Sequence, residues 1–108
     1  MPYVSITTAK KIDCPAKEKL NQEICAIMTT LPGKNKDNTL ICLIDEKPMF
    51  KSGAPNNGVF CEVRLFGQSP EDAKKEFAQK MKAIITDVLK LEENDCLYMN
   101  YIENETWG

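Results

Sequence analysis

The strongest constraint on the fold is an order of elements that occurs twice: strand, amphipathic helix, strand. In the first half, residues 2–8 (PYVSITT) are rich in β-branched and aromatic residues, which predicts a strand. Residues 39–45 (TLICLID) form a near-continuous apolar run of strand length, of the kind that is usually buried on both faces. Between the two runs, one apolar stripe recurs at helical spacing: Leu20, Ile24, Ile27, Met28 and Leu31.

The second half repeats this layout. Residues 59–67 (VFCEVRLFG) alternate in polarity, so that one face carries Val59, Cys61, Val63 and Leu65, and the other carries Phe60, Glu62, Arg64 and Phe66. A helical stripe follows, made by Ala73, Phe77, Ile84, Ile85 and Val88. Residues 96–102 (CLYMNYI) are predicted to form the last strand.

Local signals predict where the helices begin and end. Asp13-Cys14-Pro15 offers a capping side chain and a proline in the first turn, and Pro32-Gly33 stops that helix. Ser69-Pro70-Glu71-Asp72 predicts the second helix, with Ser69 as the cap and two acids in the positively polarised first turn. The turn-rich connection between the halves has room for a short strand at Met49–Phe50.

This order predicts an α/β (α+β) fold: two β-α-β units form a four-stranded mixed sheet, with two helices on one face. The whole chain, residues 1–108, is expected to make a single domain. Two helices leave the other sheet face open, where Phe60 and Phe66 would lie. Another copy of the chain is the simplest cover for that face, so the pattern predicts self-association.

Composition excludes several functions. The chain has 14 basic and 16 acidic residues and a single arginine, Arg64, so nucleic acid is not an expected partner. There is no histidine, which removes Ser-His and Cys-His catalysis and most zinc sites, and we expect neither a metal nor a cofactor.

Location is predicted from the same sequence. No apolar run is long enough to span a membrane and the start lacks the apolar stretch of a signal peptide, so we expect a cytoplasmic protein without a membrane partner. Five widely spaced cysteines contain no C-x-x-C pair, and we expect them to be reduced and mostly buried.

The element order alone also fits ferredoxin-like binding modules, so it does not fix the function. More specific are short motifs at fixed places along the whole chain. In order they are Met1-Pro2 before a strand, Gly33-Lys34, Met49-Phe50 with Gly53, Phe66-Gly67, Tyr98-Met99-Asn100-Tyr101 and Trp107-Gly108. Together these resemble macrophage migration inhibitory factor and its relatives in the tautomerase superfamily.

The resemblance implies a homotrimer with sites at subunit interfaces and cofactor-free keto-enol tautomerisation of phenylpyruvate-like 2-oxo acids, which are small-molecule substrates. Pro2 matches the catalytic amino-terminal proline once Met1 is removed, and Lys34 matches the lysine that faces the substrate carboxylate. Phe66 falls where an isoleucine makes backbone contact. Tyr98 and Asn100 match residues that a neighbouring subunit supplies.

The chemistry of these residues is coherent with that role. Proton transfer between carbon and oxygen needs a base that works near neutral pH. Burial in an apolar wall, with the Lys34 ammonium nearby, would lower the pKa of the Pro2 nitrogen. Val4, Phe66 and Trp107 are the expected wall. Tyr98 and Asn100 lie two residues apart and therefore face the same side of a strand.

Several positions depart from the family pattern. Gly58 stands where a C-x-x-C partner of Cys61 would be, which gives no support to that redox activity. Phe66 replaces an isoleucine, Arg64 replaces a histidine, and the aromatic-ending tail after Trp107 is absent. Substrate choice is therefore the least constrained property. The alternative is a cytokine-like or regulatory trimeric binding protein that keeps the pocket without using it.

Overall fold

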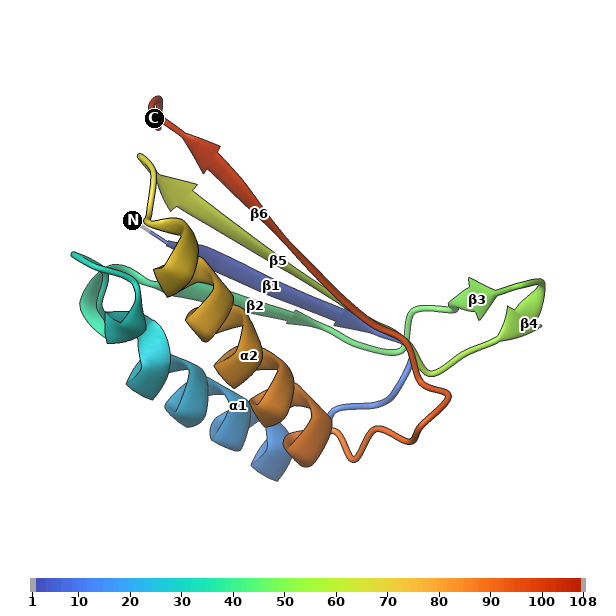
Figure 1. Ribbon diagram of the computed structural model, residues 1–108. Helices are drawn as coiled ribbons and strands as arrows, with labels where there is room; N and C mark the ends of the chain where they lie inside the picture. Colours follow the sequence, from blue (N-terminus) through green and yellow to red (C-terminus); the bar gives the residue numbers. More distant parts are fainter. Residues whose placement is uncertain (1, 108) are drawn as a thin grey trace.

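The computed structural model describes residues 2–107 and shows a mixed sheet with both long helices on one face (Figure 1). The main sheet has four strands in the order β2-β1-β5-β6. Their bounds are β1 (Tyr3–Thr8), β2 (Leu40–Ile44), β5 (Val59–Phe66) and β6 (Leu97–Asn104). The predicted fold class and the four predicted main strands are confirmed, with ends shifted by one or two residues.

The pairing reflects the two halves of the sequence. β1 pairs in parallel with β2, and β5 pairs in parallel with β6, as expected for two β-α-β crossovers. β1 and β5 run antiparallel and join the halves at the centre of the sheet. The register places Tyr3 between Leu40 and Arg64, so the residues just before β1 lie at the edge where β5 and β6 end.

The first helix, α1 (Cys14–Ile27), begins as predicted. The Asp13 side chain accepts a hydrogen bond from the Ala16 N–H at 2.9 Å, and a proline occupies the first turn. The helix tightens into the 3₁₀ turn η1 (Met28–Thr30), and a second 3₁₀ turn, η2 (Lys36–Asn38), precedes β2.

The second helix, α2 (Glu71–Val88), begins differently from the prediction. Pro70 occupies the cap position, so Ser69 lies one residue too early to cap the helix. The Ser69 N–H instead donates to Glu103 on β6 at 2.7 Å, which fixes the chain before the helix starts. Neither α2 nor any other helix within residues 2–107 has the length and apolar character to cross a membrane.

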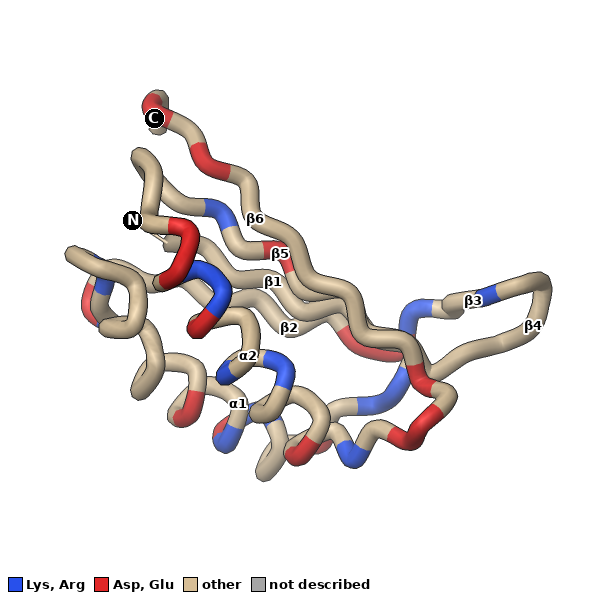
Figure 2. The backbone as a smooth tube through the Cα atoms, in the orientation of Figure 1, with Lys and Arg blue, Asp and Glu red and all other residues tan. Residues whose placement is uncertain are grey.

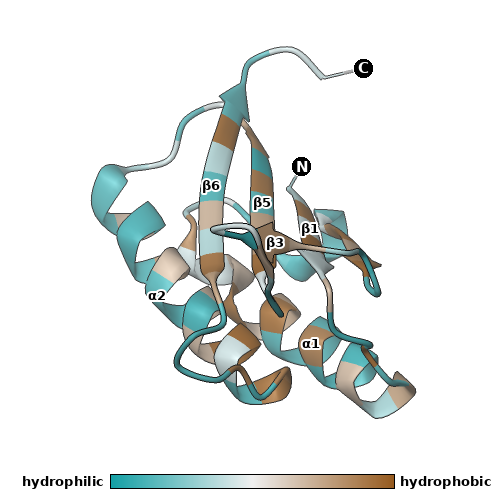
Figure 3. Ribbon diagram, turned by 90° about the vertical axis from the view of Figure 1, so that its right-hand side faces the viewer, coloured by the Kyte–Doolittle hydropathy of each residue, from teal (hydrophilic) through white to brown (hydrophobic). Residues whose placement is uncertain are grey.

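The hydrophobic core fills the space between the helices and one face of the sheet. Strand alternation sends every second residue of β1 and β5 into it, and the bands of hydropathy along β5 are visible in Figure 3. The largest fully buried side chains are Phe77, Ile6, Ile12, Leu20, Ile24, Met28, Leu31, Leu65, Met81, Ile85, Val4 and Val63.

The other face of the sheet is uncovered in the single chain. Large apolar side chains are exposed there, among them Leu40 at 65%, Phe66 at 48% and Tyr98 at 58%. Burial of residues 39–45 on both faces therefore requires a cover from outside the chain, because the helices cover only one face of β2. Charge is sparse on this sheet: β1 and β2 carry none (Figure 2).

The connection between the halves forms a hairpin that projects from the sheet (Figure 1). Its strands are β3 (Phe50–Lys51) and β4 (Ala54–Pro55), which pair with each other. The turn residues Ser52 and Gly53 have φ of 54° and 79°, a left-handed conformation that glycine adopts without cost. The short strand predicted at Met49–Phe50 is thus present, displaced by one residue.

The cysteines only partly match the prediction. All five are free thiols, but Cys61 alone is buried, whereas Cys14 is exposed and the others are partly exposed. Cys61 is inward-facing on the central strand β5, and burial raises the pKa of its thiol to about 12. It therefore stays protonated and packs as a small apolar residue.

A polar cluster fastens the start of α2 to the end of β6. The Lys74 ammonium lies 2.6 Å from one Glu103 carboxylate oxygen, and both side chains are largely buried. The other oxygen accepts from the Ser69 N–H, and the Tyr101 hydroxyl donates to the Lys74 carbonyl at 2.6 Å. The hydrogen bond from Lys74 is the main cause that lowers the pKa of Glu103.

We predict that Glu103→Gln lowers the free energy of unfolding at pH 7 by about 1.5–3 kcal/mol, because a charge-assisted bond is lost and Lys74 remains largely buried. The folded-state pKa of Glu103 is depressed, so its contribution is present above the unfolded pKa and disappears as pH falls through the folded pKa. Urea unfolding at pH 7 and at pH 3 measures both effects. If the free energy of unfolding differs between wild type and variant by the same amount at pH 7 and at pH 3, this account is contradicted.

Candidate functional site

Pro2 lies immediately before the central strand β1 and is buried. Its carbonyl accepts a hydrogen bond from the Leu40 N–H at 3.0 Å, which ties it to the start of β2. Beside it is an open cavity of about 410 Å³. The cavity is lined by Pro2, Tyr3, Asn38, Leu40, Arg64, Asn104, Thr106 and Trp107.

Arg64 brings a positive charge into this cavity. It pairs with Tyr3 across β1 and β5, so it lies next to the backbone of the residue that follows Pro2. Its Nε donates to the Glu62 carboxylate at 2.7 Å, and half of its side chain remains exposed. Sequence reasoning noted Arg64 as a departure from the family pattern but did not place it in the site. The alternation of β5 puts Arg64 on the open face, but its place beside Pro2 depends on the pairing of β5 with β1, which is distant in sequence.

Tyr3 contributes a neutral hydroxyl. Burial is the main cause that raises its pKa, and the neighbouring Cys42 thiol on β2 adds to the effect. The phenol therefore stays protonated across the physiological range and can donate a hydrogen bond.

Lys34 and Phe66 meet at the same end of the sheet. The Lys34 ammonium donates to the Phe66 backbone carbonyl at 3.0 Å, at the last residue of β5. Continuing the β1–β5 register places Pro2 opposite Leu65, so Phe66 is one residue away along the neighbouring strand. Neither Lys34 nor Phe66 lines the cavity in the single chain.

The expected apolar wall is only partly present. Trp107 lines the cavity with Pro2 as expected. Val4 does not: it is fully buried in the core between sheet and helices. Strand alternation is the reason, because Val4 shares the helix-covered face of β1 with Ile6, whereas the cavity lies at the sheet end.

Tyr98 and Asn100 share the open face of β6, as their spacing predicts, but neither lines the Pro2 cavity of the same chain. Tyr98 pairs with Phe60, which in turn pairs with Thr7 at the other end of β1. Five residues of strand separate that position from Pro2, or about 17 Å along the sheet. One chain therefore brings Pro2, Lys34 and Phe66 to one end and leaves Tyr98 and Asn100 elsewhere.

Solved structures share this architecture at low sequence identity. MIF2 from Leishmania major superposes with a TM-score of 0.88 at 19% identity, over 100% of this chain and 92% of that one. A fused 4-OT in an asymmetric trimer superposes with a TM-score of 0.81 at 14% identity, over 98% of this chain and 90% of that one. Pt0534 inactivated by 2-oxo-3-pentynoate superposes with a TM-score of 0.80 at 14% identity, over 98% of this chain and 90% of that one.

The chain has the fold of these MIF and 4-OT structures. The structural matches cover nearly the whole chain and include a MIF protein and a fused 4-OT, as the sequence motifs indicated. No protein-family model and no curated protein sequence matches the chain. Identities below 20% support the fold and leave the activity to be argued from the residues themselves.

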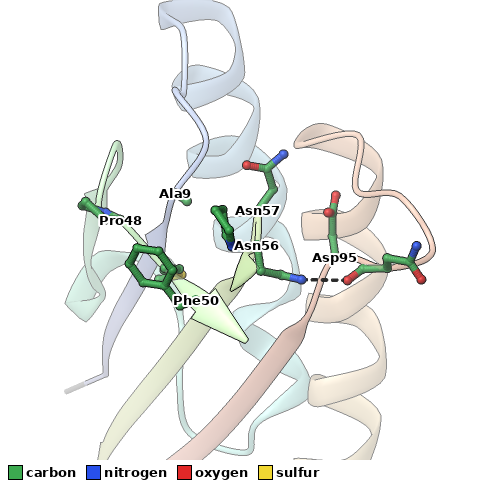
Figure 4. A pocket seen from close by; sticks show the side chains of 9 residues that line it. Ala9, Pro48, Phe50, Asn56, Asn57 and Asp95 are labelled. Atoms are coloured by element: carbon green, nitrogen blue, oxygen red, sulfur yellow. Dashed lines mark hydrogen bonds between the residues drawn. The ribbon is translucent and has the colours of Figure 1, made fainter. Parts of the chain in front are cut away.

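A second cavity lies at the opposite end of the sheet, beside the hairpin (Figure 4). It measures about 390 Å³ and has a polar side where the Asn56 amide donates to the Asn94 carbonyl at 3.0 Å. None of the predicted site residues lines it. The Pro2 cavity is thus the candidate site, although the expectation that Met1 is removed lies outside the described residues.

Proposed function

We propose that the protein is a cofactor-free isomerase that interconverts keto and enol forms of phenylpyruvate-like 2-oxo acids, with the nitrogen of processed Pro2 as general base. The observation that carries this proposal is the position of Pro2: buried at the start of the central strand, next to a cavity with a cation and an aromatic ring. A free secondary amine there has a fixed ring and therefore a lone pair held in one direction.

The proton transfer balances without a cofactor. In the enol-to-keto direction, the hydroxyl loses a proton as its oxygen forms the carbonyl, while the carbon–carbon π electrons take up a proton at C3. A base near its own pKa at neutral pH can accept and return that proton. Burial of Pro2 and the positive charge of Arg64 both disfavour a protonated amine and would lower its pKa.

The remaining residues have proposed roles in binding. Lys34 would bind the substrate carboxylate by moving its ammonium from the Phe66 carbonyl, 3.0 Å away, to the ligand. Phe66 would present that backbone carbonyl and its exposed ring to the site. The 2-oxo acid class is supported by Pt0534, which shares the fold and is inactivated by 2-oxo-3-pentynoate.

We further propose a homotrimer in which Tyr98 and Asn100 of a neighbouring copy complete each site. Two observations support it: the open sheet face exposes Leu40, Phe66 and Tyr98, and Tyr98 lies about 17 Å along the sheet from its own Pro2. A fused 4-OT of the same fold occurs as an asymmetric trimer. Closed symmetry would cover all three open faces at once.

The first test concerns the amino terminus. With Met1 attached, the Pro2 nitrogen is an amide without basicity, so we predict that a variant whose terminus cannot be cleaved folds but has no phenylpyruvate ketonisation activity. Processed protein should be active, with kcat/KM falling below about pH 6 as the depressed amine is protonated. Intact mass confirms each terminus. Equal activity in the two forms would show that this nitrogen is not the base.

The second test concerns shared sites. Lys34→Ala and Asn100→Ala should each lower kcat/KM by about 10- to 100-fold through loss of a substrate contact. If the two residues come from different subunits, trimers mixed from both variants will contain some intact sites and regain activity. Light scattering establishes the trimer, and mass spectrometry establishes subunit exchange. Exchange without recovery of activity, or a stable monomer, would contradict the shared-site proposal.

A further inference from the structure

A third cavity lies where the hairpin meets the starts of β5 and β6, and it contains a nucleophile. It measures about 220 Å³ and adjoins the cavity of Figure 4, with which it shares part of its lining. Its chemically reactive side chains are Lys51, Cys96 and Tyr98. No residue that lines the Pro2 cavity lines this one, which we call the Cys96 cavity.

The duplicated architecture makes the Cys96 cavity the counterpart of the Pro2 cavity. In the first half, Tyr3 on the open face pairs with Leu40, and both line the Pro2 cavity. In the second half, Phe60 on the open face pairs with Tyr98, and both line the Cys96 cavity. Each β-α-β unit therefore builds a cavity at the same place, and the antiparallel pairing of β1 with β5 puts the two at opposite ends of the sheet.

The two counterparts differ in the groups that they offer. Val59 stands in the place of Pro2, one residue before the open-face residue of its strand, so the Cys96 cavity has no terminal amine. Two residues before the paired residue of the second strand stand Asn38 in one cavity and Cys96 in the other. The Cys96 cavity thus repeats the position of the candidate site, with a thiol as its nucleophile.

Cys96 is held in this cavity by its backbone, and its thiol is free. The Cys96 N–H donates to the Asn56 side chain at 3.1 Å, and the Cys96 carbonyl accepts from the Val59 N–H at 2.8 Å. Both partners line the cavity, and Cys96 is partly exposed. A fixed and accessible thiol is suited to attack an electrophile, because sulfur is strongly nucleophilic as the thiolate.

Lys51, on the hairpin strand β3, adds a positive charge beside the sulfur. The pKa of Lys51 is raised, with its contact with Cys96 as the largest cause and Tyr98 as a smaller one. The ammonium is charged at neutral pH, and a carboxylate attached to the carbon under attack would lie against it. Phe50 and Phe60, which are 68% and 39% exposed, supply apolar surface for a ring.

We propose that the Cys96 cavity is a second ligand site, which binds aryl-substituted 4-oxo-2-enoic acids and captures them on the Cys96 sulfur. In these conjugated acids the carboxylate is attached to the carbon that the sulfur attacks, which matches the place of Lys51 beside the thiol. The inference goes beyond the proposed function and does not depend on Pro2.

The capture step balances without a cofactor or a leaving group. The thiolate sulfur bonds to the alkene carbon next to the carboxylate, and the π electrons of the alkene move to the ketone as an enolate. The other alkene carbon then takes a proton, replacing the one that the thiol released to solvent. The product is a thioether whose mass is that of protein plus ligand, so mass spectrometry detects it.

The test uses two probes that differ in charge: 3-benzoylacrylate and its neutral amide, 3-benzoylacrylamide. Peptide mass spectrometry at pH 8 gives the rate of addition at each cysteine, and exposed Cys14 is the internal reference. The ratio of acid to amide rates should be higher at Cys96 than at Cys14. Lys51→Gln should lower the ratio at Cys96 by about 2- to 5-fold, the range of an ion pair in contact with solvent, and leave it unchanged at Cys14.

Three further variants separate the charge from the cavity. Lys51→Arg keeps the charge and should retain most of the preference for the acid. Lys82→Gln, which removes an exposed charge on α2, is the control that leaves both ratios unchanged. Phe50→Ala removes an exposed apolar ring and should slow both probes at Cys96 without affecting Cys14. Thermal melting of each variant confirms that it folds.

The outcomes separate this inference from the proposed function. A preference for the acid at Cys96 that depends on Lys51 supports the inference. The same labelling in protein that has no ketonisation activity would sustain the inference and contradict the proposed function. Equal ratios at Cys96 and Cys14, a ratio at Cys96 that Lys51→Gln does not change, or no addition at Cys96 would overturn the inference.

Discussion

One-sided burial of the sheet is the constraint on which the rest of the structure depends. The two helices cover one face, and the core residues of the central strands β1 and β5 have at most 2% of their surface exposed. The opposite face has no cover within the chain and carries exposed leucine, phenylalanine and tyrosine side chains. Burial of an apolar area of this kind against another molecule is favourable, which is why we propose assembly. The proposed active site depends on the same open face, because Tyr98 and Asn100, which a neighbouring copy would supply, lie on it.

The central strand fixes the position of the proposed base. β1 lies between β2 and β5, so its first residues are held by backbone pairing on both sides. Pro2 is thereby buried at a position where a chain terminus would otherwise fray. Rigid placement matters because a base must be positioned relative to the bond that it acts on. The polar cluster of Lys74 and Glu103 adds rigidity nearby by fixing the loop before α2.

Much of this architecture was predictable from sequence, because strand alternation and helical spacing are local signals. The inward set of β5 and the Asp13 cap match the prediction. Other features depend on partners distant in sequence. Pro70, not Ser69, is at the helix cap, and the Ser69 N–H binds Glu103, 34 residues away. Likewise, no local pattern shows that Arg64 shares a cavity with Pro2, or that four of the five cysteines are at least partly exposed.

The central claim is that the fold turns the Pro2 nitrogen into a base that works near neutral pH. The most direct measurement is an NMR titration of processed protein labelled with ¹⁵N-proline, following the amine of Pro2. We predict a pKa of about 6, since burial and neighbouring positive charge both disfavour the protonated amine. A pKa at or above about 8, the ordinary range of an exposed α-amino group, in folded, trimeric protein would contradict the account.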